Sequence, residues 1–193
     1  MEEIAIAVGI SWIVLFIVWL PGYFVHRIVI NVPHPLLQVF VRILLGVGFL
    51  LIVLSTHPRF HRFGAFHIPI TPHTLALGII GLIIDYAGII FAIWARFTLG
   101  KNWSSNVVLQ REQQLVQTGP YAITRHPIYT GIFFGLLGTA ITWGYLTAYF
   151  GVICCLIALI IRVNMEDRLM SEQFGAVHGA YRRHTKKLIP GIW

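Results

Sequence analysis

Residues 119–131 read GPYAITRHPIYTG and lie at the mouth of an apolar hairpin, between two stretches hydrophobic enough for a membrane. Linkers between membrane helices do not ordinarily concentrate Arg, His, Tyr, Pro and Gly in so short a run. The prolines and glycines fix the backbone, while Arg125, His126 and the tyrosines supply hydrogen-bond donors and aromatic faces. The stretch therefore indicates a binding site at a bilayer surface. A second polar cluster, residues 162–172, could return to the same surface.

The composition around this stretch is that of an integral membrane protein. Of the 193 residues, 57% are hydrophobic and 11% are charged, whereas about 25% of the residues of a soluble domain are charged. The mean hydropathy is +0.78, and a water-soluble fold of this length cannot bury so much apolar surface. We expect one membrane domain over residues 1–193, because this length is typical of a single domain.

Five apolar stretches approach the roughly 20 helical residues that cross the hydrocarbon core of a bilayer. They predict an all-α membrane fold with helices at residues 4–20, 36–55, 73–97, 128–141 and 146–163. Three helices thus fall within residues 1–98. The last two form a tight helical hairpin, and the fourth is short for a full crossing.

Two segments, residues 100–125 and 164–193, are polar enough to lie outside the lipid. In the second, apolar residues recur at helical spacing, which predicts an amphipathic helix at the membrane surface, broken near Gly175. Basic residues concentrate in these two segments, whereas the N-terminus carries only acids. The positive-inside pattern then places the N-terminus outside and both polar segments in the cytoplasm, although Arg59 and Arg62 fall on the outer side.

The net charge of +7 fits this membrane arrangement and attraction to anionic lipids better than binding to nucleic acid. Cys154 and Cys155 are adjacent within an apolar stretch, which indicates packing and not a disulfide framework. The N-terminus lacks the basic region and cleavage site of a secretory signal, so we expect the first helix to be retained.

Several histidines crowd the second connection, which raises the question of a metal site. They are His57, His61, His67 and His73. Pro58 interrupts helical pairing among them, and no cysteine or carboxylate completes a ligand set. We therefore expect no metal.

Two charged pairs are candidates for chemistry. Arg125 and His126 precede Pro127, and could be merely an interfacial basic cluster at the start of a helix; the neighbouring glycines and tyrosines favour a binding role. Arg162 and Glu166 are four residues apart and share a helix face. They are either a surface ion pair or an Arg that orients an anionic substrate beside a Glu that binds a cation.

The sequence leaves the roles of three further residues open. Trp103 follows the third helix and is either a headgroup-level anchor or the wall of a ligand pocket. Asp167 adjoins Glu166, and we expect it to be solvated, although it could be the second acid of the site. Asp85 is an intramembrane acid, which is a functional hypothesis by default, but its partner is not visible in the sequence.

Soluble nucleotide-binding and hydrolase motifs are absent: the sequence has no G-x-G-x-x-G after a strand, no Walker A motif and no G-x-S-x-G. A nucleotide-like cofactor would therefore have to be held outside a Rossmann fold.

From about residue 99 to 190, the chain resembles the isoprenylcysteine carboxyl methyltransferase and phospholipid methyltransferase superfamily of membrane enzymes. Residues 119–131 look like its cofactor motif, and residues 162–169, RVNMEDRL, look like its Arg–Glu–acid motif. The closing pattern is similar in Phe174, Gly175, Tyr181, Ile189 and Pro190. Three residues depart from the family pattern: Asp167, where a second Glu is common, His178, where Tyr is frequent, and Lys187, where Arg is frequent.

The resemblance implies S-adenosylmethionine as methyl donor, S-adenosylhomocysteine as product and a cytoplasmic site within residues 99–193. It implies cofactor-binding residues Leu115, Gly119, Pro120, Tyr121, Arg125, His126, Pro127, Tyr129 and Glu166. It further implies substrate-binding Asn102 and Trp103, and catalytic Arg162 and Glu166.

The expected reaction is carboxyl O-methylation of a lipidic, isoprenylcysteine-like acceptor among membrane lipids. Two alternatives remain: N-methylation of a phospholipid amine, and a non-enzymatic lipid-binding protein of the same fold.

Overall fold

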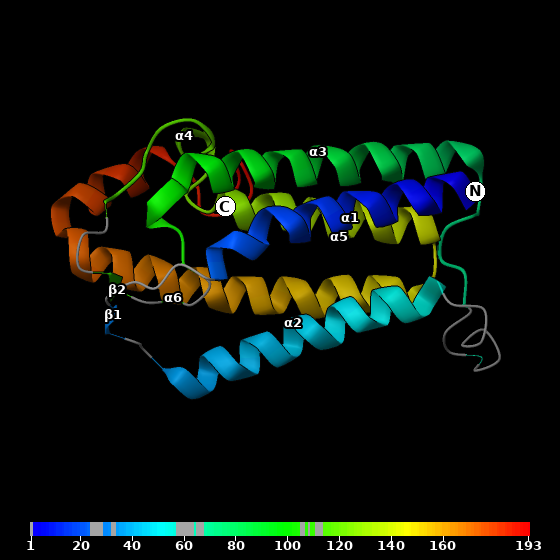
Figure 1. The fold of residues 1–193 in the computed structure, drawn as a ribbon, viewed down its shortest axis with the longest axis horizontal. Helices are drawn as coiled ribbons and strands as arrows, with labels where there is room; N and C mark the ends of the chain where they lie inside the picture. Colours follow the sequence, from blue (N-terminus) through cyan, green and yellow to red (C-terminus); the bar gives the residue numbers. More distant parts are fainter. Residues whose placement is uncertain are drawn as a thin grey trace.

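The computed structural model describes residues 2–23, 29–31, 34–56, 64, 68–104, 107, 109–110 and 114–193. Its long helices run side by side along one axis (Figure 1). They are α1 (Glu2–Tyr23), α2 (Pro35–Thr56), α3 (Leu75–Leu99), α5 (Pro127–Trp143) and α6 (Leu146–His184). Four are long and apolar enough to cross a membrane, and α5 is a shorter apolar helix. The predicted all-α, multi-pass membrane fold is confirmed.

Short elements join the helices at one end of the bundle. They are a 3-10 turn, η3 (Gly100–Asn102), a helix of one turn, α4 (Pro120–Ile123), and two strands, β1 (Val29–Asn31) and β2 (Leu109–Gln110). The strands pair antiparallel. This pairing was not predicted, because two or three residues carry too little periodicity to indicate a strand.

The hairpin between α5 and α6 is as tight as the sequence predicts. Gly144 caps α5 in a left-handed conformation, and Tyr145 is the N-cap of α6. The segment after the second connection pairs with this tip, with Ile70 N–H donating to Gly144 O at 2.8 Å and Leu146 N–H donating to Ile68 O at 2.8 Å. These bonds satisfy backbone groups that the helix ends leave open.

Helix α6 differs from the prediction of a membrane span followed by a separate surface helix. It continues as one helix from Leu146 past Val163 to the kink at Gly175, because residues 152–174 contain no proline or glycine. The uninterrupted part, residues 146–174, is about 44 Å long, which exceeds the hydrocarbon thickness of about 30 Å, so part of it must lie outside the lipid. The predicted break is confirmed at Gly175, whose φ of 48° and ψ of −119° leave the helical region.

Glycines bring α3 and α5 into backbone contact. Helix α3 packs mainly on α5, and α2 mainly on α6. A Cβ added to Gly88 would lie 2.5 Å from Gly131 O and 2.5 Å from Gly135 N. Such close approach is the usual role of small residues between membrane helices.

Asp85 finds partners on two other helices. Ser11 Oγ in α1 donates to Asp85 Oδ2 at 2.5 Å, and Thr139 Oγ1 in α5 donates to Oδ1 at 2.9 Å. Trp12 Nε1 donates to Thr139 Oγ1 at 3.0 Å. The acid is fully buried, and this network offsets the cost of placing a polar group within the bundle.

The polar segments gather at the end of the bundle opposite the N-terminus (Figure 1). There α3 ends, α4 and the start of α5 lie, and α6 bends beyond Gly175 back toward α4. The predictions that involve His57, His61, His67, Arg59 and Arg62 lie outside the described residues.

Candidate active site

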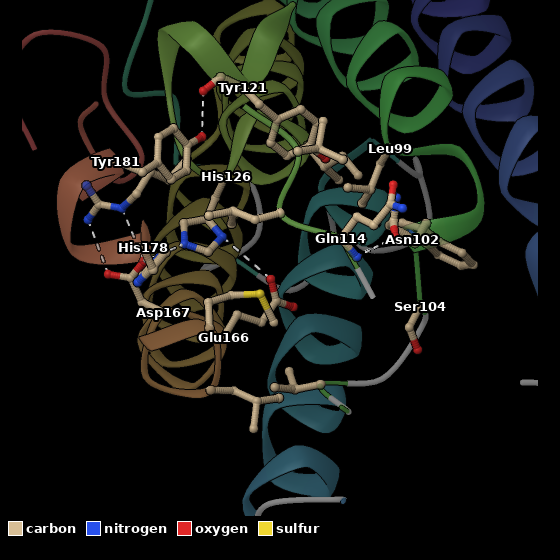
Figure 2. A pocket seen from close by; sticks show the side chains of 18 of the residues that line it. Leu99, Asn102, Ser104, Gln114, Tyr121, His126, Glu166, Asp167, His178 and Tyr181 are labelled. Atoms are coloured by element: carbon tan, nitrogen blue, oxygen red, sulfur yellow. Dashed lines mark hydrogen bonds and ion pairs between the residues drawn. The ribbon is translucent and has the colours of Figure 1, made fainter. Parts of the chain in front are cut away.

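A pocket of about 120 Å³ lies at this end of the bundle (Figure 2). Its walls come from the segment after α3, the segment from residue 114 to the first turn of α5, and the second half of α6. Eight of the predicted site residues line it: Asn102, Trp103, Leu115, Tyr121, Arg125, His126, Tyr129 and Glu166.

The other predicted site residues shape the pocket from behind its lining. Gly119 is the N-cap of α4 and Pro120 its first residue, while Pro127 is the first residue of α5. A proline fits the first helical position because it has no N–H to leave unpaired there. Arg162 lies behind Tyr129, and its Nε donates to the Tyr129 hydroxyl at 2.6 Å.

The loop between α4 and α5 is fastened to the C-terminal tail. Arg125 N–H donates to Lys186 O at 2.8 Å, and His126 N–H donates to Lys187 O at 3.1 Å. The Tyr181 hydroxyl donates to Tyr121 O at 2.5 Å. Helix α4 ends at Ile123 and α5 begins at Pro127. The backbone N–H groups between the two helices are therefore available for this pairing.

Asp167 is the centre of an ion-pair cluster, which corrects the expectation that it is solvated. Its buried carboxylate accepts from Arg125 Nε at 3.1 Å and from Nη2 at 3.2 Å. A further N–H of Arg125 donates to Thr185 O. Lys187 Nζ lies 3.5 Å from Asp167 Oδ2. The Arg125 guanidinium is thus engaged with the protein itself.

His126 lies between two carboxylates (Figure 2). Its Nε2 is 3.3 Å from Asp167 Oδ1, and its Nδ1 is 3.5 Å from Glu166 Oε2. Burial alone would lower the pKa of His126, but the hydrogen bonds and negative charges of Asp167 and Glu166 outweigh it and raise the pKa above the ordinary value. The site therefore favours a positively charged imidazolium.

Glu166 is held on its other side by Tyr129 and Arg162. The Tyr129 hydroxyl donates to Glu166 Oε1 at 2.5 Å, and Arg162 Nε lies 3.3 Å from the same oxygen. The Arg162 guanidinium also lies over the Tyr129 ring, 5.6 Å from its centroid. Arg162 and Glu166 are therefore not a simple surface ion pair, because a third side chain joins them and both are mostly buried.

The wall opposite α6 is aromatic. Trp103 and Tyr121 are buried and pack in one apolar cluster with Ile128. The Arg96 guanidinium lies over the Trp103 ring at 4.3 Å from its centroid, and Asn102 Oδ1 accepts from Gln114 N–H at 2.9 Å. Of the two roles open to Trp103, the structure supports the pocket wall over the headgroup anchor.

A sequence profile of the isoprenylcysteine carboxyl methyltransferase (ICMT) family matches residues 79–172. The chain is similar to that family over these residues, just under half of its length. The match confirms the resemblance found in the sequence, and the family segment contains every predicted site residue, from Asn102 to Glu166.

Two curated relatives match about half of the chain. The uncharacterized protein YpbQ of Bacillus subtilis (strain 168) is 28% identical over 102 residues, covering 52% of this chain and 60% of the relative. The nickel-cobalt-cadmium resistance protein NccN of Alcaligenes xylosoxydans xylosoxydans is 30% identical over 97 residues, covering 49% and 45%. The chain thus spans about half the length of the curated relatives it matches.

Sequence reasoning did not assign several lining residues to the site. Those in and around the family segment include Ser104, Val107, Gln114, Ile128, Met170, His178 and Tyr181. Tyr181 could have been found, since it recurs at helical spacing with Glu166 in the amphipathic pattern. His178 lies beyond the Gly175 kink, and only the bend in α6 returns it to within 3.6 Å of Asp167.

Within the described part of the chain, no group of three or more His, Cys, Asp or Glu side chains is placed to hold a metal ion.

Proposed function

We propose that this protein is an S-adenosylmethionine-dependent methyltransferase that acts on a lipidic acceptor. The reaction that fits the site best is carboxyl O-methylation of an isoprenylcysteine-like compound. The observation that carries the proposal is the Glu166 carboxylate, which is held by Tyr129 and Arg162 and lines a pocket at the end of a membrane-spanning bundle. The similarity of residues 79–172 to a membrane methyltransferase family supports it.

The residues present fit the groups of S-adenosylmethionine. A carboxylate such as that of Glu166 suits its ammonium, and His126 helps to hold that carboxylate, with Nδ1 3.5 Å from its Oε2. The buried rings of Trp103 and Tyr121 suit its adenine. The pocket of about 120 Å³ is smaller than the about 300–1,000 Å³ of typical ligand sites, so binding requires its walls to move apart. When bound, the cofactor would supply an electrophilic methyl group on a sulfonium.

The protein's own contribution is to orient the acceptor and to exclude water. A carboxylate acceptor has a pKa near 4 and is ionised at neutral pH, so it needs no base. In that case the positive charge of Arg162, which lies behind Tyr129, attracts the acceptor's negative charge.

An amine acceptor would first have to lose a proton, and Glu166 is the candidate base. In the structure Glu166 already accepts hydrogen bonds from Tyr129 and Arg162, which makes it a poor proton acceptor. This arrangement favours O-methylation over N-methylation of a phospholipid.

The pocket opens on the cytoplasmic side in this proposal. It lies at the end where the basic third connection and tail meet, and the acidic N-terminus lies at the other end (Figure 1). The positive-inside pattern supports this orientation.

The test is methyl transfer by the detergent-purified protein from labelled cofactor to a prenylated cysteine or to a phospholipid amine. We expect base-labile methyl esters on the prenylated cysteine, lost in Glu166→Gln and retained in Glu172→Gln, a matched change at an exposed position of the same helix. Base-stable methylamines would favour the phospholipid reaction instead. Transfer to neither acceptor would overturn the proposed reaction.

A further inference from the structure

Gln38 is a buried polar residue on α2 that bonds to a wall of the pocket. Its Nε2 donates to Val107 O at 2.9 Å, and its Oε1 accepts from Val107 N–H at 3.2 Å. One carboxamide therefore satisfies both backbone groups of one residue, as a neighbouring strand would. Val107 is 2% exposed and lines the pocket.

The surroundings of Gln38 show that this contact is specific. Its neighbours Leu36, Leu37, Val39 and Phe40 are apolar, and Gln38 itself is 6% exposed. A buried carboxamide in an apolar helix is unfavourable unless its donor and acceptor are both paired. The Val107 backbone supplies both partners.

A second connection fastens the same stretch to the N-terminal half of the chain. Strand β1, which precedes α2, pairs with β2, with Val29 opposite Gln110 and Asn31 opposite Leu109. Val107 and strand β2 are thus held, respectively, by the first turn of α2 and by strand β1. Gln38 and β1, which hold this stretch, both precede the family segment, which begins at residue 79.

We propose that Gln38 is a positioning residue of the cofactor pocket. Its carboxamide holds Val107 in place, so that the part of the chain that precedes the family segment fixes one wall of the site. The inference rests on the proposed function in that it takes the pocket to bind S-adenosylmethionine and S-adenosylhomocysteine.

Three variants of the full chain in detergent separate this role from a general effect on folding. Gln38→Leu keeps the volume and removes both hydrogen bonds. Gln38→Glu supplies one donor and one acceptor only while its carboxyl is protonated. Val39→Ala is the matched control, because Val39 is the next residue and is 45% exposed.

Two readouts are combined: hydrogen exchange of the peptide that contains Val107, and calorimetric binding of S-adenosylhomocysteine. In Gln38→Leu we expect faster exchange at Val107 and roughly tenfold weaker binding, since both hydrogen bonds that hold this wall are lost. Val39→Ala should change neither. For Gln38→Glu, the ratio of its dissociation constant to that of the parent at the same pH should rise with pH, because the carboxyl loses the proton that it donates. Arg42, whose Nε donates to Gln38 O at 3.3 Å, is a nearby charge that favours the ionised acid.

Unchanged binding in a folded Gln38→Leu protein would overturn the inference, whatever the exchange rate. If that variant does not fold, a flat ratio across pH for Gln38→Glu would overturn it equally. Absence of binding by the parent would instead overturn the proposed function and, with it, the role of Gln38 in cofactor binding. Exchange at Val107 would still report separately whether Gln38 holds the wall.

Discussion

Arg125 and Asp167 form a two-point ion pair, with Nε 3.1 Å from Oδ1 and Nη2 3.2 Å from Oδ2. Their side chains are 8% and 6% exposed. The pair joins the loop before α5 to α6, and Arg125 also donates to Thr185 O in the tail. One carboxylate therefore fixes three segments that together build the pocket.

Removal of the Asp167 charge should destabilise the fold strongly. We expect Asp167→Asn to lower the free energy of unfolding by about 3–5 kcal/mol, because it leaves buried positive charge without its partner. Glu172→Gln breaks the i, i+4 pair with Arg168, whose side chains are 75% and 55% exposed, and should cost less than about 1 kcal/mol. Thermal unfolding of both variants in the same detergent compares them. Equal losses would contradict the central role of Asp167.

The burial of Asp167 shows where the sequence ceases to predict the site. Helical spacing places Glu166 and Asp167 on α6, but it does not reveal that the tail folds back over them. That return depends on the kink at Gly175 and on backbone bonds between residues 125–126 and 186–187, which are about 60 residues apart. Length and hydropathy, by contrast, suffice for the membrane helices, because each helix satisfies its own backbone groups.

The charge on His126 should make stability depend on pH. Its pKa is raised in the folded protein, so the stabilisation is fully present below the unfolded value, about 6.5, and is lost as pH rises through the higher folded value. His126→Gln is neutral throughout. The difference in melting temperature between parent and variant should therefore be largest near about pH 6 and shrink at alkaline pH. A difference that grows with pH would show that His126 is not charged in the fold.

The Tyr129 hydroxyl should contribute to cofactor binding through Glu166. It donates to Glu166 at 2.5 Å and accepts from Arg162 at 2.6 Å. Hydrogen bonds to charged groups contribute about 1.5–3 kcal/mol, so Tyr129→Phe should weaken S-adenosylhomocysteine binding by roughly ten- to a hundredfold. Tyr149→Phe is the control, because that hydroxyl lies 3.3 Å from Thr71 Oγ1 near the hairpin tip. Similar affinity in both variants would exclude a role for Tyr129.

Backbone contact between α3 and α5 should make Gly88 intolerant of a side chain. We expect Gly88→Ala to cost about 1–3 kcal/mol, since its Cβ would meet Gly131 O and Gly135 N at 2.5 Å. Gly46→Ala in α2 meets nothing within 4 Å and should be neutral or slightly stabilising. Melting temperatures of the two variants decide the matter, and an unaffected Gly88→Ala protein would contradict the observed helix approach.

Hydrogen bonds between segments far apart in the chain could not be predicted from the sequence for a similar reason. Asp85 accepts from Ser11, which is 74 residues away, and Gln38 bonds to Val107, which is 69 residues away. A single polar residue in an apolar helix indicates that a hydrogen-bond partner exists, because an unpaired polar group there is costly. The identity of that partner depends on how the helices pack, which hydropathy alone does not determine.

The most direct test of the account is calorimetric titration of the purified protein with S-adenosylhomocysteine, alongside His126→Ala and Glu166→Ala. We expect the parent to bind and both variants to lose binding while they remain folded and monodisperse. A folded, monodisperse parent that does not bind would contradict the methyltransferase assignment and favour a lipid-binding protein of the same fold.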